Sequence, residues 1–219
     1  LRVALRRLRA ALRLLRPFRL DDSRPNPETA LRQFGQHLGA VRDLDVAVSQ
    51  LDQEQAVQQN PDDSGLTAFR QYLLRQRDLA RKEMIAALTS AEHADCRTLL
   101  SSWLAIGLAS ETLSPLAEAP WRDAFVKFFF RDLRRLRRQG EKLTPDTAER
   151  SYHLLRIRVR RLRYLIEFFA PGGLGLGLQH CHHHLVRLQE QLGRLQDLAM
   201  GRDLLLRFLI AEREHGVTP

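Results

Sequence analysis

An arginine-rich segment of 17 residues occurs twice in this chain, and the repeat restricts the folds that the sequence can adopt. The first copy, LRVALRRLRAALRLLRP, covers residues 1–17, and the second, LRIRVRRLRYLIEFFAP, covers residues 155–171. Without a gap, 7 of the 17 positions are identical. The same offset of 154 residues aligns LGAVRDL at 38–44 with LGRLQDL at 192–198. A match that keeps its register over this length predicts a duplicated helical unit.

Hydrophobic residues recur at helical spacing along the whole chain, and no alternating run is long enough for a sheet. Two of the apolar stripes are Phe125, Phe128, Phe129, Leu133 and Leu136, and Leu155, Val159, Leu162, Ile166 and Phe169. The sequence therefore predicts an all-α protein. Prolines, glycines and polar clusters divide it into eight expected helices. Their expected ranges are 1–16, 27–59, 66–90, 94–110, 121–139, 144–170, 178–198 and 202–215. Short loops favour antiparallel packing, so a literal duplication predicts one helical bundle over 1–113 and a second over 114–219.

The charge of the chain favours a phosphate-rich partner. Lys and Arg number 35 against 26 Asp and Glu, which gives a formal net charge of +9, and 32 of the 35 basic residues are Arg. Guanidinium groups present a planar fork of donors that suits phosphate oxygens. A phosphorylated polyanion is therefore the leading class of partner, and a helical surface that is merely basic and solvated is the alternative.

Other features of the sequence narrow the class of protein. Cys96 and Cys181 lack paired or metal-type spacing, which fits a reducing compartment such as the cytoplasm. No window approaches the roughly 18 uncharged apolar residues that a membrane span requires. The sequence also contains no Gly-rich phosphate loop and no nucleophile with a matching base. We therefore expect neither a catalytic site nor a cofactor.

The arginines of the first copy lie beside its apolar stripe. The apolar positions are Leu1, Leu5, Leu8, Leu12 and Leu15, and the basic positions are Arg2, Arg6, Arg9, Arg13 and Arg16. The two stripes differ by one residue, which is about 100° around a helix. The guanidinium groups are therefore expected at the edge of a helix–helix contact, where they can line a groove. The row extends over roughly 20 Å, which suits an extended polyanion better than a compact one.

The second copy and the helix before it carry further basic faces. In the second copy, His153, Arg156, Arg160 and Arg163 follow at steps of three, four and three. The preceding helix supplies Arg131, Arg134, Arg135 and Arg138. We expect the two helices to form an antiparallel hairpin with facing basic rows. An imidazole in register with arginines can donate a hydrogen bond to a phosphate.

Two segments resemble metal sites, but we interpret them otherwise. Asp43 and Asp45 point to different sides of a helix, and we expect Asp43 to hold an arginine of the basic rows. In HCHHH, residues 180–184, only the first and last histidines share a helix face, and no Glu or Cys pair has zinc-site spacing. We therefore expect no functional metal site.

These motifs together resemble the CHAD domain, the conserved histidine α-helical domain. The resemblance rests on HLLRIRVRRLRY at 153–164, RVALRRLRA at 2–10, LGAVRDLDV at 38–46 and LGRLQDL at 192–198, and it spans nearly the whole chain. It implies a single CHAD-like domain over 1–219, with two four-helix bundles related by pseudo-twofold symmetry around a basic groove or pore. It also implies binding of inorganic polyphosphate without catalysis, association with polyphosphate granules and, in some proteins, fusion to a CYTH-type triphosphatase domain.

The resemblance implies polyphosphate contacts in both copies. The matching residues are Arg2, Arg6, Arg7 and Arg9 in the first copy, Arg42 in the RDLDV motif, and His153, Arg156, Arg160, Arg161 and Arg163 in the second. Spacing adds Arg13, Arg131, Arg134, Arg135 and Arg138 to the expected site. The second copy follows an expected helix, whereas the first begins at residue 1. We therefore expect the natural protein to extend upstream, with the first helix of the first bundle and the counterpart of His153 before Leu1; the alternative is a shorter variant in which this start is an original feature.

Three other functions share some of these features. A helical nucleic-acid-binding protein would use the same electrostatics, although the basic rows contain few aromatic residues for base stacking and no helix-turn-helix. An enzyme, either a histidine-dependent metal hydrolase or a polyphosphate-processing activity, would need catalytic motifs that the sequence lacks. A purely structural oligomerisation domain would not depend on its arginines. The leading hypothesis is a cytoplasmic, non-enzymatic module that binds polyphosphate.

Overall fold

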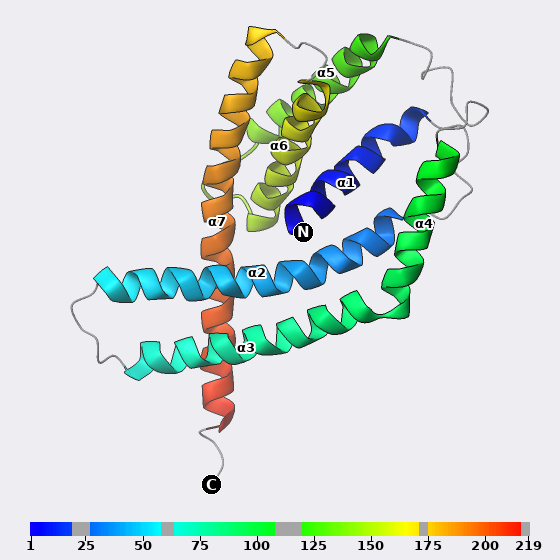
Figure 1. Cartoon of the computed structure of the whole chain (residues 1–219). Coiled ribbons are helices and arrows are strands. Elements are labelled where there is room, and N and C mark those ends of the chain that lie inside the picture. The colour runs from blue at the N-terminus through cyan, green and yellow to red at the C-terminus, as the bar shows by residue number, and fades with distance from the viewer. Residues whose placement is uncertain (19–26, 58–63, 108–119, 171–174, 216–219) are drawn as a thin grey trace. The chain divides into compact units, whose positions relative to one another are not determined.

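The computed structural model describes residues 1–18, 27–57, 64–107, 120–170 and 175–215. All regular secondary structure in these ranges is helical, as predicted. The α-helices are α1 (Arg2–Leu15), α2 (Glu28–Val57), α3 (Ser64–Thr89), α4 (Ala91–Gly107), α5 (Trp121–Gly140), α6 (Glu149–Phe169) and α7 (Leu176–His215), and the 3₁₀ turn η1 (Arg16–Phe18) follows α1 (Figure 1). None of these helices is both long enough and apolar enough to cross a membrane.

The described residues belong to two compact units. The first unit comprises Leu1, Val3–Leu31 and Asp95–Arg194, and the second comprises Arg2, Arg32–Ala94 and Leu195–Pro219. Helices α1, α2, α4 and α7 therefore contribute residues to both units, α1 through Arg2 alone to the second. The expected division into duplicated bundles at residues 113 and 114 stays a prediction.

The core of the first unit lies between α5 and α6. Its buried side chains follow the apolar stripes that the sequence predicts on these helices: Phe125, Phe128, Phe129 and Leu136 of α5, and Leu155, Val159, Leu162 and Ile166 of α6. Leu185 and Leu192 of α7 complete the cluster. Helical periodicity was sufficient to predict this face because the stripe on each helix packs against the other.

The helices α5 and α6 run antiparallel, as expected for the hairpin. Trp121 at the start of α5 stacks on Phe169 at the end of α6, with ring centroids 5.7 Å apart. At the other end of the pair, Nε2 of Gln139 donates to the carbonyl oxygen of Ser151 over 3.0 Å. The basic residues of the two helices therefore lie on one antiparallel scaffold.

The helix α1 buries a shorter stretch than its apolar stripe predicts. Leu12 is buried and Leu14 packs against the core of the first unit, but Leu1 and Leu15 are 78% and 45% exposed. An amphipathic pattern shows which face of a helix turns inward, but not how far its partners extend along that face. The contact is centred on the C-terminal half of α1.

The helix α6 begins later than expected. The sequence predicts a start at Thr144 and Pro145, but the structure places the first helical residue at Glu149. The N–H of Thr144 donates to Oγ1 of Thr147 over 2.8 Å, and the N–H of Thr147 donates to the carbonyl oxygen of Thr144 over 2.9 Å. The threonine hydroxyl thus supports a local turn that competes with an earlier start of the helix.

The helices expected at 178–198 and 202–215 are a single helix, α7, of 40 residues. The described residues therefore form seven α-helices instead of eight. Gly201 lies inside α7, although the expected break falls there. Met200 and Leu204 beside it pack against the core of the second unit. Packing on both sides of the glycine outweighs its low helix propensity, which is only about 1 kcal/mol worse than that of Ala.

The continuous helix predicts that Gly201→Ala stabilises the protein. A Cβ at Gly201 would meet no neighbouring atom within 4 Å, so the methyl group fits without strain. We expect a gain of about 0.5–1 kcal/mol, because Ala loses less conformational freedom in a helix than Gly. Denaturant unfolding followed by circular dichroism measures the change. A loss of stability would contradict a helix that continues through residue 201.

The second unit has a smaller core between α2, α3 and α7. Leu44, Ala47 and Val48 of α2 pack with Leu73 of α3, which is fully buried. Phe208 of α7 adds ring contacts to this unit, with centroids 5.3 Å from Phe69 and 5.5 Å from Tyr72. Each unit thus has a hydrophobic cluster of its own.

Candidate anion-binding site

An arginine-rich pocket opens between α1, α5 and α6 of the first unit. Its basic lining residues are Arg6, Arg9 and Arg13 of α1, Arg131 of α5, and Arg160 and Arg161 of α6. Asp132 is the single acidic residue of the lining, so the lining carries a formal charge of +5. The volume open to water-sized molecules is about 110 Å³, well above the roughly 10–15 Å³ that one water needs. We call this site the arginine pocket.

Local helix geometry explains how these arginines converge. Arg6, Arg9 and Arg13 follow at steps of three and four, which places them on one face of α1. On α6, Val159 and Leu162 are fully buried on either side of the adjacent arginines 160 and 161. Burial of the apolar neighbours sets the rotation of α6 and so directs these two arginines to the pocket.

Apolar side chains form the rest of the pocket. They are Phe128, Ile157, Tyr164, Leu165 and Phe168, with Ala10, Leu14 and Pro17 at α1 and η1. The guanidinium carbon of Arg131 lies 5.0 Å from the ring centroid of Phe128, a cation–π contact that helps to orient it. Apolar walls lower the local dielectric constant, so the charges in the pocket act more strongly than on an open surface.

Like charges surround Arg161. Its side chain is exposed overall, but partial burial of the guanidinium lowers its pKa, the nearby Asp132 opposes this decrease, and Arg13, Arg131 and Arg158 add to it. Asp132 also forms an ion pair with Arg131, with Oδ1 3.0 Å from Nε. One carboxylate thus stands among several guanidinium groups. A bound anion would relieve the repulsion between them.

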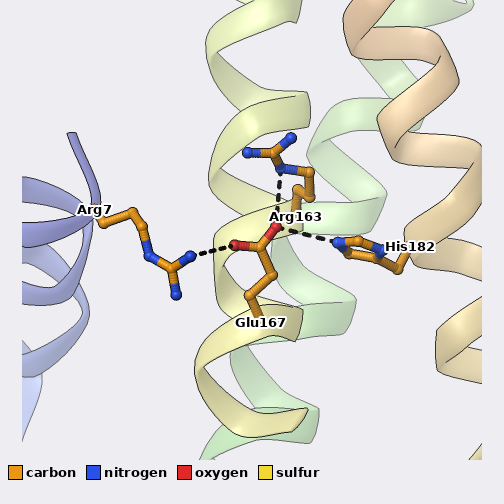
Figure 2. A network of polar contacts seen from close by, with 4 residues as sticks. All are labelled: Arg7, Arg163, Glu167 and His182. Carbon is orange, nitrogen blue, oxygen red and sulfur yellow. Dashed lines mark hydrogen bonds and ion pairs between the residues drawn. The ribbon is translucent and has the colours of Figure 1, made fainter. Parts of the chain in front are cut away.

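A second polar cluster, which we call the Glu167 network, lies in the same unit (Figure 2). Oε2 of Glu167 is 3.5 Å from Nη1 of Arg7, and its Oε1 is 3.1 Å from both Nε of Arg163 and Nε2 of His182. The Glu167 side chain is only 22% exposed. The carboxylate therefore faces basic groups of α1, α6 and α7, the arrangement in which an external phosphate could also be held.

The other predicted site residues lie outside the lining of the arginine pocket. Arg134, Arg135, Arg138, His153 and Arg42 are exposed on α5, α6 and α2. Nη2 of Arg156 lies 3.8 Å from the position that a Cβ on Gly193 would take. Arg2 belongs to the second unit, where its Nη2 is 3.5 Å from Oδ1 of Asp43. The expectation that Asp43 holds an arginine of the basic rows is confirmed.

Two acidic residues that organise these clusters, Asp132 and Glu167, were not singled out from the sequence. Glu167 carries a detectable signal, since the offset of 154 residues matches it to Arg13 in the first copy. When matched positions of a repeat carry opposite charges, the two side chains cannot make the same ionic contacts. Asp132 carries no such signal, because only the packing of α5 against α6 brings it to the pocket.

The histidine-rich segment and the cysteines show no arrangement typical of a catalytic centre. Nε2 of His180 and Nε2 of His184 are 2.9 Å apart, but no three His, Cys, Asp or Glu residues in the described part of the chain could hold a metal ion together. Cys96 and Cys181 are free thiols, and burial raises the pKa of both. A raised pKa disfavours the thiolate that a reactive cysteine requires.

Comparison with known proteins identifies the family. The family model described as the CHAD domain matches residues 1–206. The chain belongs to the CHAD domain family. The basic repeats, which carried the resemblance in the sequence, lie within the matched range.

Two solved structures are similar to this CHAD domain. The crystal structure of the CHAD domain from the plant Ricinus communis has a TM-score of 0.77 and 25% identity, and the match covers 98% of this chain and 69% of that chain. PptA from Streptomyces chartreusis has a TM-score of 0.62 and 18% identity, with 97% and 88% of the two chains covered. The likeness to PptA concerns the fold alone. No curated protein matches this sequence.

Proposed function

We propose that this CHAD domain binds inorganic polyphosphate and does not cleave it. The observation that carries the proposal is the arginine pocket, in which six guanidinium groups accompany a single carboxylate. A guanidinium fork can bind two phosphate oxygens at once, and linked phosphates can engage several forks in succession. Membership of the CHAD family supports the same ligand, since polyphosphate binding is what the resemblance of the motifs implies.

The shape of the basic row favours an extended ligand. Arg13 lies seven residues after Arg6 on α1, with Arg9 between them, which corresponds to about 10 Å along the helix axis. A single phosphate can contact only part of such a row, whereas a chain of phosphates can follow it. We propose that the residues of the pocket make the first contacts with the polyphosphate chain. The other predicted residues, among them His153 and Arg156, remain proposed contacts for its extension.

The polar groups of the pocket are suited to binding. Besides the arginines, its titratable side chains are Asp132, which pairs with Arg131, and Tyr164, which is buried. An arginine stays protonated near neutral pH and therefore serves as a poor proton donor or acceptor in catalysis. We propose that the domain acts in the cytoplasm as a non-enzymatic module that can associate with polyphosphate granules.

Competition between polyanions tests the proposed ligand. Long-chain polyphosphate should displace labelled RNA or DNA from the protein. It should do so at a lower concentration of phosphate groups than unlabelled nucleic acid requires. The polyphosphate affinity should also fall steeply with salt, because each neutralised phosphate releases counterions. Failure of polyphosphate to displace nucleic acid at matched charge would favour a nucleic-acid-binding protein. Shortening of polyphosphate in the presence of Mg²⁺ or Zn²⁺, followed on gels, would contradict binding without turnover.

A further inference from the structure

The repeat relates two pairs of residues on α1 and α6. With an offset of 154 residues, Arg7 of α1 matches Arg161 of α6, and Arg13 of α1 matches Glu167 of α6. Arg7 lies 3.5 Å from Glu167, and Arg13 and Arg161 both line the arginine pocket. The two pairs of residues therefore occupy the same matched positions, with the two helices exchanged. One pair has opposite charges, and the other has like charges.

This difference makes the two ends of the α1–α6 contact electrostatically unequal. At one end, Arg13 and Arg161 both line the arginine pocket, where Arg131 adds further positive charge. Arg13 also pairs with Glu28, which does not line the pocket. At the other end, the carboxylate of Glu167 already stands between Arg7 and Arg163. An anion therefore meets a lining with a net formal charge of +5 at the first end, and a carboxylate that already lies between two arginines at the second.

The Glu167 network adjoins the arginine pocket. The guanidinium carbon of Arg7 lies 5.8 Å from the ring centroid of Phe168, and that ring also lines the pocket. The side chains of Arg163 and Glu167 are only 20% and 22% exposed, so their interaction is less screened by water than a pair on the surface. A phosphate chain that leaves the pocket past Phe168 would meet this network next.

We propose that Glu167 is an internal anion that occupies the place of a phosphate beside Arg7 and Arg163. This proposal rests on the proposed function and adds a residue that determines specificity. Polyphosphate binds first between Arg13 and Arg161, and it reaches Arg7 only by displacing the carboxylate. Glu167 therefore limits the length of chain that the site holds tightly and has little effect on the binding of a compact anion.

Glu167→Gln tests this role, because it removes the charge and keeps the size of the side chain. We expect the affinity for long-chain polyphosphate to rise roughly 3- to 10-fold, since Arg7 and the partly buried Arg163 become available. The affinity for pyrophosphate should change by less than about twofold, because that probe fits within the pocket. The logarithm of the affinity for long chains should also fall more steeply with the logarithm of the salt concentration. The increase in slope should correspond to about one to two additional phosphate contacts. Titration calorimetry with both probes measures these changes.

A matched control separates this effect from net charge. Glu141→Gln also removes one carboxylate from the first unit and also releases an arginine, since Oε1 of Glu141 is 2.7 Å from Nε of Arg137. This pair is exposed and lies outside both clusters. The control should leave both affinities unchanged within about twofold. A gain with the control as large as the gain with Glu167→Gln would overturn the proposal.

Arg7→Ala in the Glu167→Gln background tests whether the gain in affinity depends on Arg7, the arginine of α1 that faces the Glu167 carboxylate. The second substitution should remove most of the gain for long-chain polyphosphate, and a gain that persists would overturn the proposal. Equal gains for pyrophosphate and long chains would do the same. Circular dichroism and thermal unfolding establish that each variant is folded.

A measurement on the wild-type protein keeps the proposal testable if these variants unfold. Phenylglyoxal modifies accessible arginines, and mass spectrometry identifies the modified positions. Pyrophosphate should protect Arg13 and Arg161 and leave the modification of Arg7 unchanged. Equal protection of all three would overturn the proposal.

The failure of the proposed function and the failure of the role of Glu167 give different results. If the wild-type protein binds no polyphosphate, the proposed function fails. If the wild-type protein binds polyphosphate but Glu167→Gln does not change the affinity according to chain length, only the role of Glu167 fails.

Discussion

Replacement of both Arg160 and Arg161 with Ala should reduce the affinity for long-chain polyphosphate about 10- to 100-fold, which is roughly 1.4–2.7 kcal/mol of binding free energy. The two residues are adjacent on α6 and contribute two of the six guanidinium groups of the arginine pocket. Apolar side chains around them, including the buried Tyr164 and Leu165, strengthen their attraction to an anion. Fluorescence anisotropy with labelled polyphosphate at several salt concentrations measures the loss.

Arg187→Ala combined with Arg194→Ala is the matched control for this variant. Both residues are exposed on the part of α7 that belongs to the first unit, and neither lines the pocket. The control removes the same charge and should weaken binding no more than about threefold. If both double variants lost affinity equally, net charge alone would account for binding, and the pocket would have no special role. The pocket variant should also show a shallower dependence of affinity on salt, because fewer counterions are released.

Leu162→Ala should cost about 2–5 kcal/mol of unfolding free energy, the range observed when a buried Leu is cut back to Ala. Leu162 is fully buried between α5 and α6 in the core of the first unit, with Phe125, Phe128 and Phe129 in the same cluster. The substitution removes apolar contacts and leaves a cavity that close-packed aromatic neighbours fill only in part. Urea unfolding followed by circular dichroism measures the change.

Leu154→Ala provides the comparison on the same helix. Leu154 is 45% exposed, so the identical change in composition removes little buried surface. We expect its effect to remain within about 0.5 kcal/mol. A similar loss of stability in both variants would mean that α6 is not anchored through the face that carries Leu162.

Much of the fold could be predicted because helical periodicity is a local property of the chain. The apolar stripes of α5 and α6 were predicted from spacing and form the core of the first unit. Local stop signals were less reliable. Gly201 does not end α7, because residues on both sides of it pack against a core. Thr144 does not start α6, because residues 144–147 form a separate turn that Thr147 closes with its hydroxyl and its N–H.

The candidate site could be predicted only in part. Spacing on α1 placed Arg6, Arg9 and Arg13 on one face, and all three line the pocket. The same reasoning grouped Arg131 with Arg134, but the first lines the pocket and the second is exposed elsewhere on α5. Residues on one broad helix face can differ by tens of degrees in direction, and only the position of the neighbouring helices separates them.

The sequence alone determined the helical class, the inward faces of the central helices and the membership of the CHAD family, because each depends on residue order and spacing. Only the tertiary structure decided which charges meet. Arg7 and Arg161 occupy matched positions of the repeat, yet one faces the carboxylate of Glu167 and the other stands among arginines. Electrostatic energy depends on distance in space and on burial, and neither quantity is set by the position of a residue in the chain.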